Sequence, residues 1–129
     1  MGENVTISNL NFINGNRSEI MGGAIMAVGS ITLTNVTFTN NLAENGGAIS
    51  VMESATINNA TFINNFAKKG GAIFSVGQTA ISNTVFTDNM ADNGGAIYNG
   101  KYLTTNNVTF ENNNVVNYGG AVISRGFHK

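Results

Sequence analysis

Side chains that could carry acid–base or metal chemistry are few in this chain. It has one histidine, His128, and no cysteine, and its seven carboxylates are spread along the sequence. These are Glu3, Glu19, Glu44, Glu53, Asp88, Asp92 and Glu111. Glycoside hydrolysis needs two carboxylates close together, and a calcium-assisted lyase needs carboxylates beside a basic Arg or Lys. Whether any of these residues can meet therefore depends on the fold.

A repeat of about 24 residues organises the chain. The block Gly-Gly-Ala-Ile begins at residues 22, 46, 70 and 94, and a variant ending in Val begins at residue 119. A phenylalanine recurs in step with this block, and so does an asparagine three residues before it. A fixed period of this kind predicts a stack of similar structural units, with one repeat in each layer.

The second complete unit shows how each layer is built. Residues 55–58 and 60–63 alternate apolar and polar side chains, which predicts two short strands with a break at Asn59. Asparagine suits a break because it tolerates left-handed backbone conformations. A second turn is expected at Asn64-Asn65, and Gly70-Gly71 either bends the chain or lets two backbones approach closely. A third strand is expected to begin at Ile73.

Such a unit is too short to hold strands and a helix, and it lacks the Leu-x-x-Leu-x-Leu core of a leucine-rich repeat. The sequence therefore predicts an all-β fold, a right-handed single-stranded parallel β-helix of about five coils, with three short strands per coil. We expect a single segment over residues 1–129. Its coils are expected at approximately 1–21 (partial), 22–45, 46–69, 70–93, 94–118 and 119–129 (partial).

In a parallel β-helix, equivalent side chains of successive coils lie above one another at the spacing of adjacent strands. Three such structural ladders are predicted. They consist of Phe12, Phe38, Phe62, Phe86 and Phe110; of Asn9, Asn35, Asn59, Asn83 and Asn107; and of Ile25, Ile49, Ile73, Ile97 and Val122. Amide side chains suit a ladder because each both donates and accepts hydrogen bonds.

Composition excludes several classes of partner. The net charge is −1 and only 10% of residues are charged, so we expect no binding to nucleic acid. No apolar run is long enough for direct membrane insertion.

Neither end resembles a capping repeat, and we therefore expect a segment of a longer array whose uncapped coils can associate end to end.

On the predicted coil, Glu44 and Asp92 share one register, two coils apart, with Lys68 between them. Strand spacing puts the two carboxylates about 10 Å apart. A solvated edge of alternating charge explains this column more simply than a catalytic site. Asp88 stands where other coils have Asn, and His128 is isolated. The Gly-Gly pairs lack the lysine of a phosphate loop and the pattern of a calcium-binding β-roll. We therefore expect no catalytic residue, no cofactor and no metal.

One outward-facing column could recognise a partner. The residue after each stacked Ile or Val is predicted to face outward, namely Met26, Ser50, Phe74, Tyr98 and Ile123. Phe74 and Tyr98 would form adjacent aromatic rungs, a surface that suits a sugar ring or another protein. The alternative is that these side chains reflect the ordinary preferences of an exposed strand.

The pairing of Gly-Gly-Ala-Ile with Phe-x-x-Asn resembles the repeat of the chlamydial polymorphic outer membrane proteins. Here the second motif runs from Phe38 to Asn41, and recurs from Phe62, Phe86 and Phe110. The Phe12 copy departs, because Gly15 replaces the asparagine. The chain is also similar to adhesin-like β-helix proteins of methanogenic archaea and gut bacteria. The resemblance implies an autotransporter-like passenger region that is secreted or exposed at the cell surface.

Two classes of function follow. The first is a non-enzymatic, adhesin-like segment that acts as a rigid stalk or as a binding surface for a host glycan or a surface protein. The second is a fragment of a polysaccharide lyase or glycoside hydrolase whose catalytic coils are missing. Scarce carboxylates and nearly identical coils favour the first. An ice-binding surface is a distant third, because regular Thr-x-Thr columns are not present.

Overall fold

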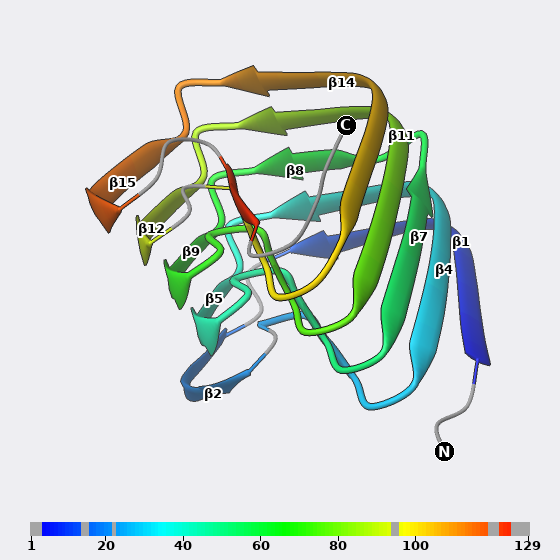
Figure 1. Cartoon of the computed structure of the whole chain (residues 1–129), viewed down its shortest axis with the longest axis horizontal. Coiled ribbons are helices and arrows are strands. Elements are labelled where there is room, and N and C mark those ends of the chain that lie inside the picture. Colours follow the sequence, from blue (N-terminus) through cyan, green and yellow to red (C-terminus); the bar gives the residue numbers. More distant parts are fainter. Residues whose placement is uncertain (1–3, 14–15, 22, 94–95, 119–121, 125–129) are drawn as a thin grey trace.

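The structure, a computed structural model, describes residues 4–13, 16–21, 23–93, 96–118 and 122–124. Within these ranges the side chains of residues 4–5, 9, 11–12, 16–21, 93, 115–118 and 122–124 are not described. All regular structure in this part of the chain is β-strand. Figure 1 shows the strands lying in parallel rows, one coil above the next.

The strands form three parallel sheets. The first contains β1 (Asn4–Ile13), β4 (Ser30–Thr39), β7 (Ser54–Asn58), β8 (Thr61–Ile63), β11 (Gln78–Thr87) and β14 (Leu103–Glu111). The second contains β2 (Asn16–Met21), β5 (Leu42–Asn45), β9 (Phe66–Lys69), β12 (Met90–Asn93) and β15 (Asn114–Tyr118). The third contains β3 (Ile25–Ala27), β6 (Ile49–Val51), β10 (Ile73–Ser75), β13 (Ile97–Asn99) and β16 (Val122–Ser124).

The register of these sheets follows the sequence repeat. Phe38 pairs with Phe62 in the first sheet, and Ile73 pairs with Ile97 in the third, each 24 residues on. Every strand pair in the described residues is parallel. The chain is therefore a parallel β-solenoid with coils of about 24 residues, which confirms the predicted fold class.

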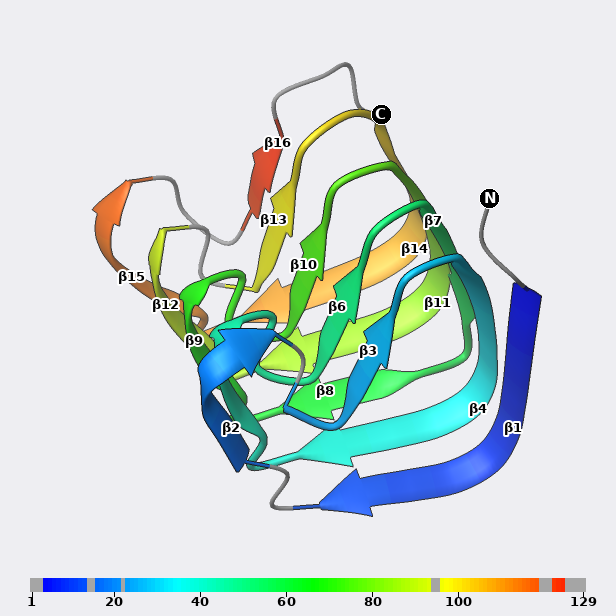
Figure 2. The ribbon, with the colours of Figure 1, turned by 90° about the horizontal axis from the view of Figure 1, so that it is seen from below.

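The strands divide the coil differently from the expectation. In the coil of Asn59 the two predicted short strands are present as β7 and β8, whereas in the other coils they are one continuous bent strand, as β1 and β4 show in Figure 2. Residues 66–69, where the sequence analysis predicted no strand, form β9 of the second sheet. The bend does not interrupt pairing, because the backbone N–H of Asn59 still donates to the carbonyl of Ser82 at 3.0 Å.

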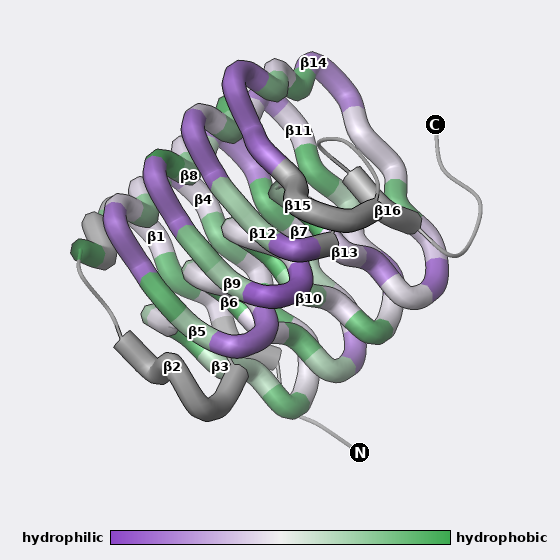
Figure 3. Tube along the Cα trace, turned by 90° about the vertical axis from the view of Figure 1, so that its left-hand side faces the viewer, coloured by the Kyte–Doolittle hydropathy of each residue, from purple (hydrophilic) through white to green (hydrophobic). Residues whose placement is uncertain are grey.

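Asparagine makes the corners of the coil. Asn35, Asn59, Asn83 and Asn107 have φ between 51° and 59°, and a second set at Asn40, Asn64, Asp88 and Asn112 has φ between 55° and 59°. Asn and Asp enter this left-handed region more readily than other residues with a side chain. Asp88 therefore substitutes for Asn, as expected from the sequence. In Figure 3 the hydrophilic segments line up from coil to coil.

The corner at Asn64 gives a test of backbone strain. This exposed side chain makes no hydrogen bond within the described part, so its replacement changes mainly the backbone preference. We expect Asn64→Ala to lower the free energy of unfolding by about 1–2 kcal/mol, because alanine resists a φ of 59°. Asn64→Gly should leave it nearly unchanged. Urea unfolding followed by circular dichroism measures both, and equal losses would refute the strain argument.

The two glycines of each pair have different tasks. Gly46 and Gly70 have φ values of 66° and 61°, so the first glycine bends the chain. A Cβ on the second glycine, Gly47, would lie 2.1 Å from the carbonyl oxygen of Gly71 in the next coil. The second glycine thus allows close approach of neighbouring backbones, and both alternatives raised by the sequence apply.

Phenylalanine rings form a column through the core. Phe38, Phe62 and Phe86 are fully buried, and their ring centroids are 4.8 and 4.7 Å apart. Phe110 continues the column 5.1 Å from Phe86. These separations match the spacing of adjacent strands, about 4.8 Å. The backbone of Phe12 pairs with that of Phe38, but its ring lies outside the described side chains.

Isoleucines fill the third sheet. Ile49, Ile73 and Ile97 are fully buried, whereas Ile25 is half-buried. Val122 pairs through its backbone with Ile97, and its side chain is not described. The core is thus built from columns of like residues, each contacting its counterparts in the coils above and below.

A second buried column consists of asparagines that follow the corner. Asn41, Asn65 and Asn89 are at most 1% exposed. The side-chain amide of Asn65 donates to the Asn89 Oδ1 at 2.9 Å and to the Phe38 carbonyl at 3.2 Å. Its Oδ1 accepts from the backbone and side-chain nitrogens of Asn41 at 3.0 and 2.9 Å. The same pattern recurs at Asn89, with Asn113 of the following coil as the acceptor.

The asparagine ladder predicted from the sequence lies at the surface. Asn59 donates to the Oδ1 of Asn35, and Asn107 donates to that of Asn83 at 2.8 Å. Between these pairs the ladder shifts, because Asn83 donates to the Oδ1 of Asn58 at 3.1 Å. All these bonds are exposed, and Asn9 lies outside the described side chains. The buried ladder is therefore the neighbouring one through Asn65.

Candidate binding site

The aromatic pair predicted from the sequence is present on the third sheet. Phe74 on β10 pairs in register with Tyr98 on β13, and these two strands lie side by side in Figure 2. The ring centroids are 5.5 Å apart with an interplanar angle of 23°, and both side chains are half-buried. The Lys69 Nζ lies 5.3 Å from the Tyr98 ring centroid, within range of a cation–π interaction. The result is a small aromatic platform with a cation at its rim.

One residue of the outward column departs from the expectation. Met26 is 46% exposed, but Ser50, between it and Phe74 in the sheet, is fully buried. The prediction that Ser50 faces solvent is therefore wrong. The backbone of Gly46 lies close to this part of the sheet, since a Cβ on Gly46 would lie 3.0 Å from the Phe74 nitrogen and 1.9 Å from the Ile49 carbonyl oxygen. The side chain of Ile123 is not described.

Burial leaves the Ser50 hydroxyl without a hydrogen-bond partner. An unsatisfied buried hydroxyl costs about 1–3 kcal/mol of stability. We therefore expect Ser50→Ala to raise the free energy of unfolding by about 1 kcal/mol. Thermal unfolding of the variant measures the gain, with Ser82→Ala on the half-buried outer face of β11 as control. A destabilised Ser50→Ala protein would contradict this account.

The carboxylates do not gather into a site. Glu44 and Lys68 form an ion pair at 3.4 Å, with side chains 43% and 67% exposed, and such exposed pairs contribute little to stability. Asp92 lies in the coil that follows that of Lys68, and is therefore two coils from Glu44, as predicted. Among the described residues, no three His, Cys, Asp or Glu side chains lie close enough to hold a metal ion. Glu3 and His128 lie outside the described residues, and the Glu19 side chain is not described.

Sequence reasoning missed an apolar stripe on the second sheet. Leu42, Phe66 and Met90 stack in register on its outer face, and Phe66 and Met90 are 41% and 40% exposed. The signal was available, because these residues occupy one position of the repeat. It was overlooked because no strand was predicted for this stretch.

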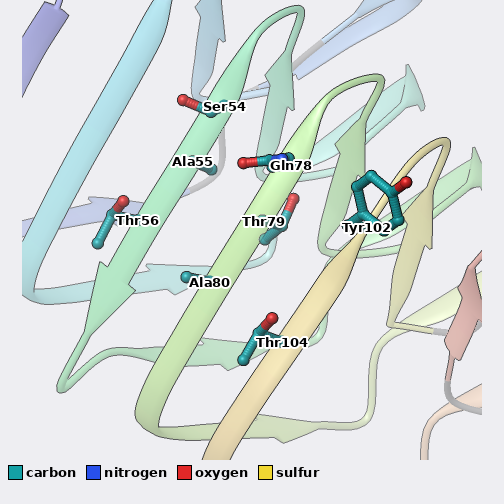
Figure 4. Close-up of a pocket in the computed structure, with 8 residues that line it drawn as sticks. All are labelled: Ser54, Ala55, Thr56, Gln78, Thr79, Ala80, Tyr102 and Thr104. Atoms are coloured by element: carbon teal, nitrogen blue, oxygen red, sulfur yellow. The ribbon is translucent and has the colours of Figure 1, made fainter. Parts of the chain in front are cut away.

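Sequence reasoning also missed a hollow on the outer face of the first sheet, here called the Tyr102 hollow. It has a volume of about 370 Å³ and is lined by Ser54, Ala55, Thr56, Gln78, Thr79, Ala80, Tyr102 and Thr104. Figure 4 shows two rows of side chains across three coils, one through Ser54, Gln78 and Tyr102 and one through Thr56, Ala80 and Thr104. None of the eight lining residues is charged.

A second hollow, here called the corner hollow, adjoins the first. It has a volume of about 440 Å³ and is lined by Ser30, Met52, Glu53, Ser54, Val76, Gly77, Gln78 and Lys101. Ser54 and Gln78 line both hollows. The corner hollow differs in carrying charge, because Glu53 and Lys101 belong to its wall.

Membrane-spanning helices are not found in the described part of the chain, which contains no helix long and apolar enough for that purpose. Together with the three parallel sheets and the columns of like residues, the described structure defines a β-solenoid repeat protein. Residues 35–51, 59–76 and 83–100 match the family model of the Chlamydia polymorphic membrane protein repeat. These three segments thus match the repeat of this family, which confirms the resemblance. Comparisons with curated proteins and with solved structures gave no match.

The three matched segments correspond to equal portions of successive coils. Each begins at a left-handed corner, at Asn35, Asn59 or Asn83, and ends at or just beyond a strand of the third sheet. Each therefore includes the stacked phenylalanine, the buried asparagine two residues before the inward-facing alanine of the second sheet, and the Gly-Gly-Ala-Ile block. The family match thus covers the same part of three successive coils of this solenoid.

Proposed function

We propose that this chain is a non-enzymatic repeat segment of a cell-surface or secreted protein, and that it acts as a rigid stalk and binding surface. The observation that supports the proposal is the uniformity of successive coils, which repeat the same corners, core columns and sheet register. The matched family describes a membrane protein repeat, which favours a surface location.

The internal structure suits a stalk. Hydrogen bonds between coils run along the axis in all three sheets and also through the buried asparagines. Each coil adds about 4.8 Å of length. Bending the stack would separate strands and break several of these bonds at once, so the solenoid should resist bending while it holds its outer faces at fixed spacing.

The outer faces suit binding better than chemistry. The carboxylates in the described part are exposed or half-buried and dispersed, without the close pair that glycoside hydrolysis requires. The Phe74–Tyr98 platform offers aromatic area at little cost in conformational entropy, which favours recognition of a glycan or of a surface protein.

The experiment combines a binding assay with an activity assay. The labelled chain is applied to a glycan array and to cell-surface extracts, and the double variant Phe74→Ala/Tyr98→Ala is compared with Thr109→Ala on an exposed strand. We expect the wild-type chain and Thr109→Ala to bind, and the double variant to bind at least about tenfold more weakly. Circular dichroism checks that both variants keep the fold.

The same preparation is incubated with a panel of polysaccharides, and reducing and unsaturated ends are measured. We expect none to be released. Clear turnover would contradict the proposal and favour a fragment of a carbohydrate-active enzyme. Absence of binding to any glycan or surface extract would contradict the adhesive part of the proposal, and only the role as a stalk would remain.

A further inference from the structure

We propose that the Tyr102 hollow binds an uncharged sugar ring of a glycan chain. This inference rests on the proposed binding function. It places a second binding site on the first sheet, in addition to the aromatic platform on the third. The hollow combines an apolar floor, a polar rim and an absence of charge, and each of these properties fits a pyranose ring.

The floor of the hollow exists because one coil lacks bulk. Thr56, Ala80 and Thr104 occupy the same register in β7, β11 and β14. Ala80 thus leaves a gap between two threonines that lie two strand spacings apart, about 9.6 Å. Tyr102, 47% exposed, lies two residues before Thr104 and next to Gln78, in the other row of the hollow (Figure 4). The alanine methyl and the tyrosine ring provide the apolar contact that the C–H face of a sugar requires.

The rim supplies hydrogen-bonding groups that the protein does not use. The side chains of Thr56, Gln78 and Thr104 are exposed and make no hydrogen bond to other described residues. A hydroxyl donates one hydrogen bond and accepts others, and an amide has both donors and an acceptor. Such groups match sugar hydroxyls, which also donate and accept. Ser54 is less available, because its hydroxyl is 2.8 Å from that of Ser30.

Other classes of partner fit this hollow less well. Its eight lining residues include no cation to bind a phosphate or a carboxylate, which disfavours nucleic acids and acidic sugars at this point. A peptide that adds a strand needs unpaired backbone groups, whereas β7 and β11 are paired on both sides. A neutral ring is the occupant that the hollow favours.

The corner hollow extends the site. Because Ser54 and Gln78 line both hollows, a ligand in one lies beside the other. Lys101 in the wall of the corner hollow provides a charged hydrogen-bond donor for the next unit of the ligand. The adjoining pair therefore suits a chain of linked sugars better than a single free monosaccharide.

The test measures binding of soluble neutral oligosaccharides, of the cello-, manno- and galacto- series, to the 129-residue chain by saturation-transfer NMR and calorimetry. Tyr102→Ala removes the ring and Ala80→Leu fills the gap. Tyr102→Phe keeps the ring, and Met90→Ala and Thr109→Leu are controls for truncation and enlargement outside the hollow. We expect about a tenfold loss of affinity or more for Tyr102→Ala and Ala80→Leu. The other three should bind within about threefold of the wild-type chain.

Failure of this inference is separable from failure of the proposed function. Unchanged affinity in Tyr102→Ala or in Ala80→Leu would overturn the site, and so would a wild-type chain that binds none of these sugars. If the chain still binds cell-surface extracts through Phe74 and Tyr98, the proposed function stands without this hollow. Circular dichroism of every variant excludes loss of the fold, and Tyr102 and Ala80 are exposed, so both should fold.

Discussion

Phe62→Ala is expected to lower the free energy of unfolding by about 3–5 kcal/mol. Phe62 is fully buried and stacks on Phe38 and Phe86, at 4.8 and 4.7 Å. Truncation removes the apolar contact and also opens a cavity between two rings. The ladder hydrogen bonds hold the coils about 4.8 Å apart, so the neighbouring rings have little freedom to close the gap.

Phe66→Ala in the same coil is the matched control, because this phenylalanine is 41% exposed on the second sheet. We expect it to lose about 1 kcal/mol or less. Urea unfolding followed by circular dichroism gives both values. Similar losses in the two variants would mean that the ring column does not hold the stack together.

Asn65→Ala is expected to lower the free energy of unfolding by about 4 kcal/mol. The substitution removes the Oδ1 that accepts from the Asn41 backbone nitrogen and side-chain amide, and also the amide that donates to the Phe38 carbonyl. Each unsatisfied buried group costs about 1–3 kcal/mol. Asn65 is itself fully buried, so water cannot replace the lost partners without opening the coil.

Asn106→Ala provides the comparison, since this asparagine is exposed on β14 and makes no side-chain hydrogen bond to other described residues. Its unfolding free energy should stay within about 0.5 kcal/mol of the wild-type value. Amide hydrogen exchange adds a local measurement, because Asn65→Ala should expose the Asn41 N–H selectively. If that N–H kept its protection, the ladder would not be its partner in solution.

The two asparagine columns show why burial was harder to predict than repetition. The sequence shows Asn at regular intervals in both, but it does not say which column faces the core. A left-handed corner turns the chain, and the direction of the next side chain depends on how sharply it turns. There was one usable signal: the exposed corner column directly before the buried one (Asn40, Asn64 and Asn112) accepts Asp88, whereas the buried column is Asn at 41, 65, 89 and 113.

The second sheet was missed for a related reason. Its strands are short, and β9 has a single buried side chain, Ala67, between exposed neighbours. Four residues with one small apolar side chain carry almost no periodic signal. The strand forms because its backbone groups pair with those of the neighbouring coil. Without this pairing they would be unsatisfied.

The sequence by itself determined the period, the parallel stacking of like residues and the identity of the ring column, because every layer repeats one local pattern and must pack on its own copy. Tertiary structure decided which asparagines are buried, that Ser50 lies under its neighbours, and where the outer face is hollow. These depend on side chains 24 residues apart that meet only when coils stack. A gap at Ala80 becomes a hollow only once Thr56 and Thr104 lie on either side of it.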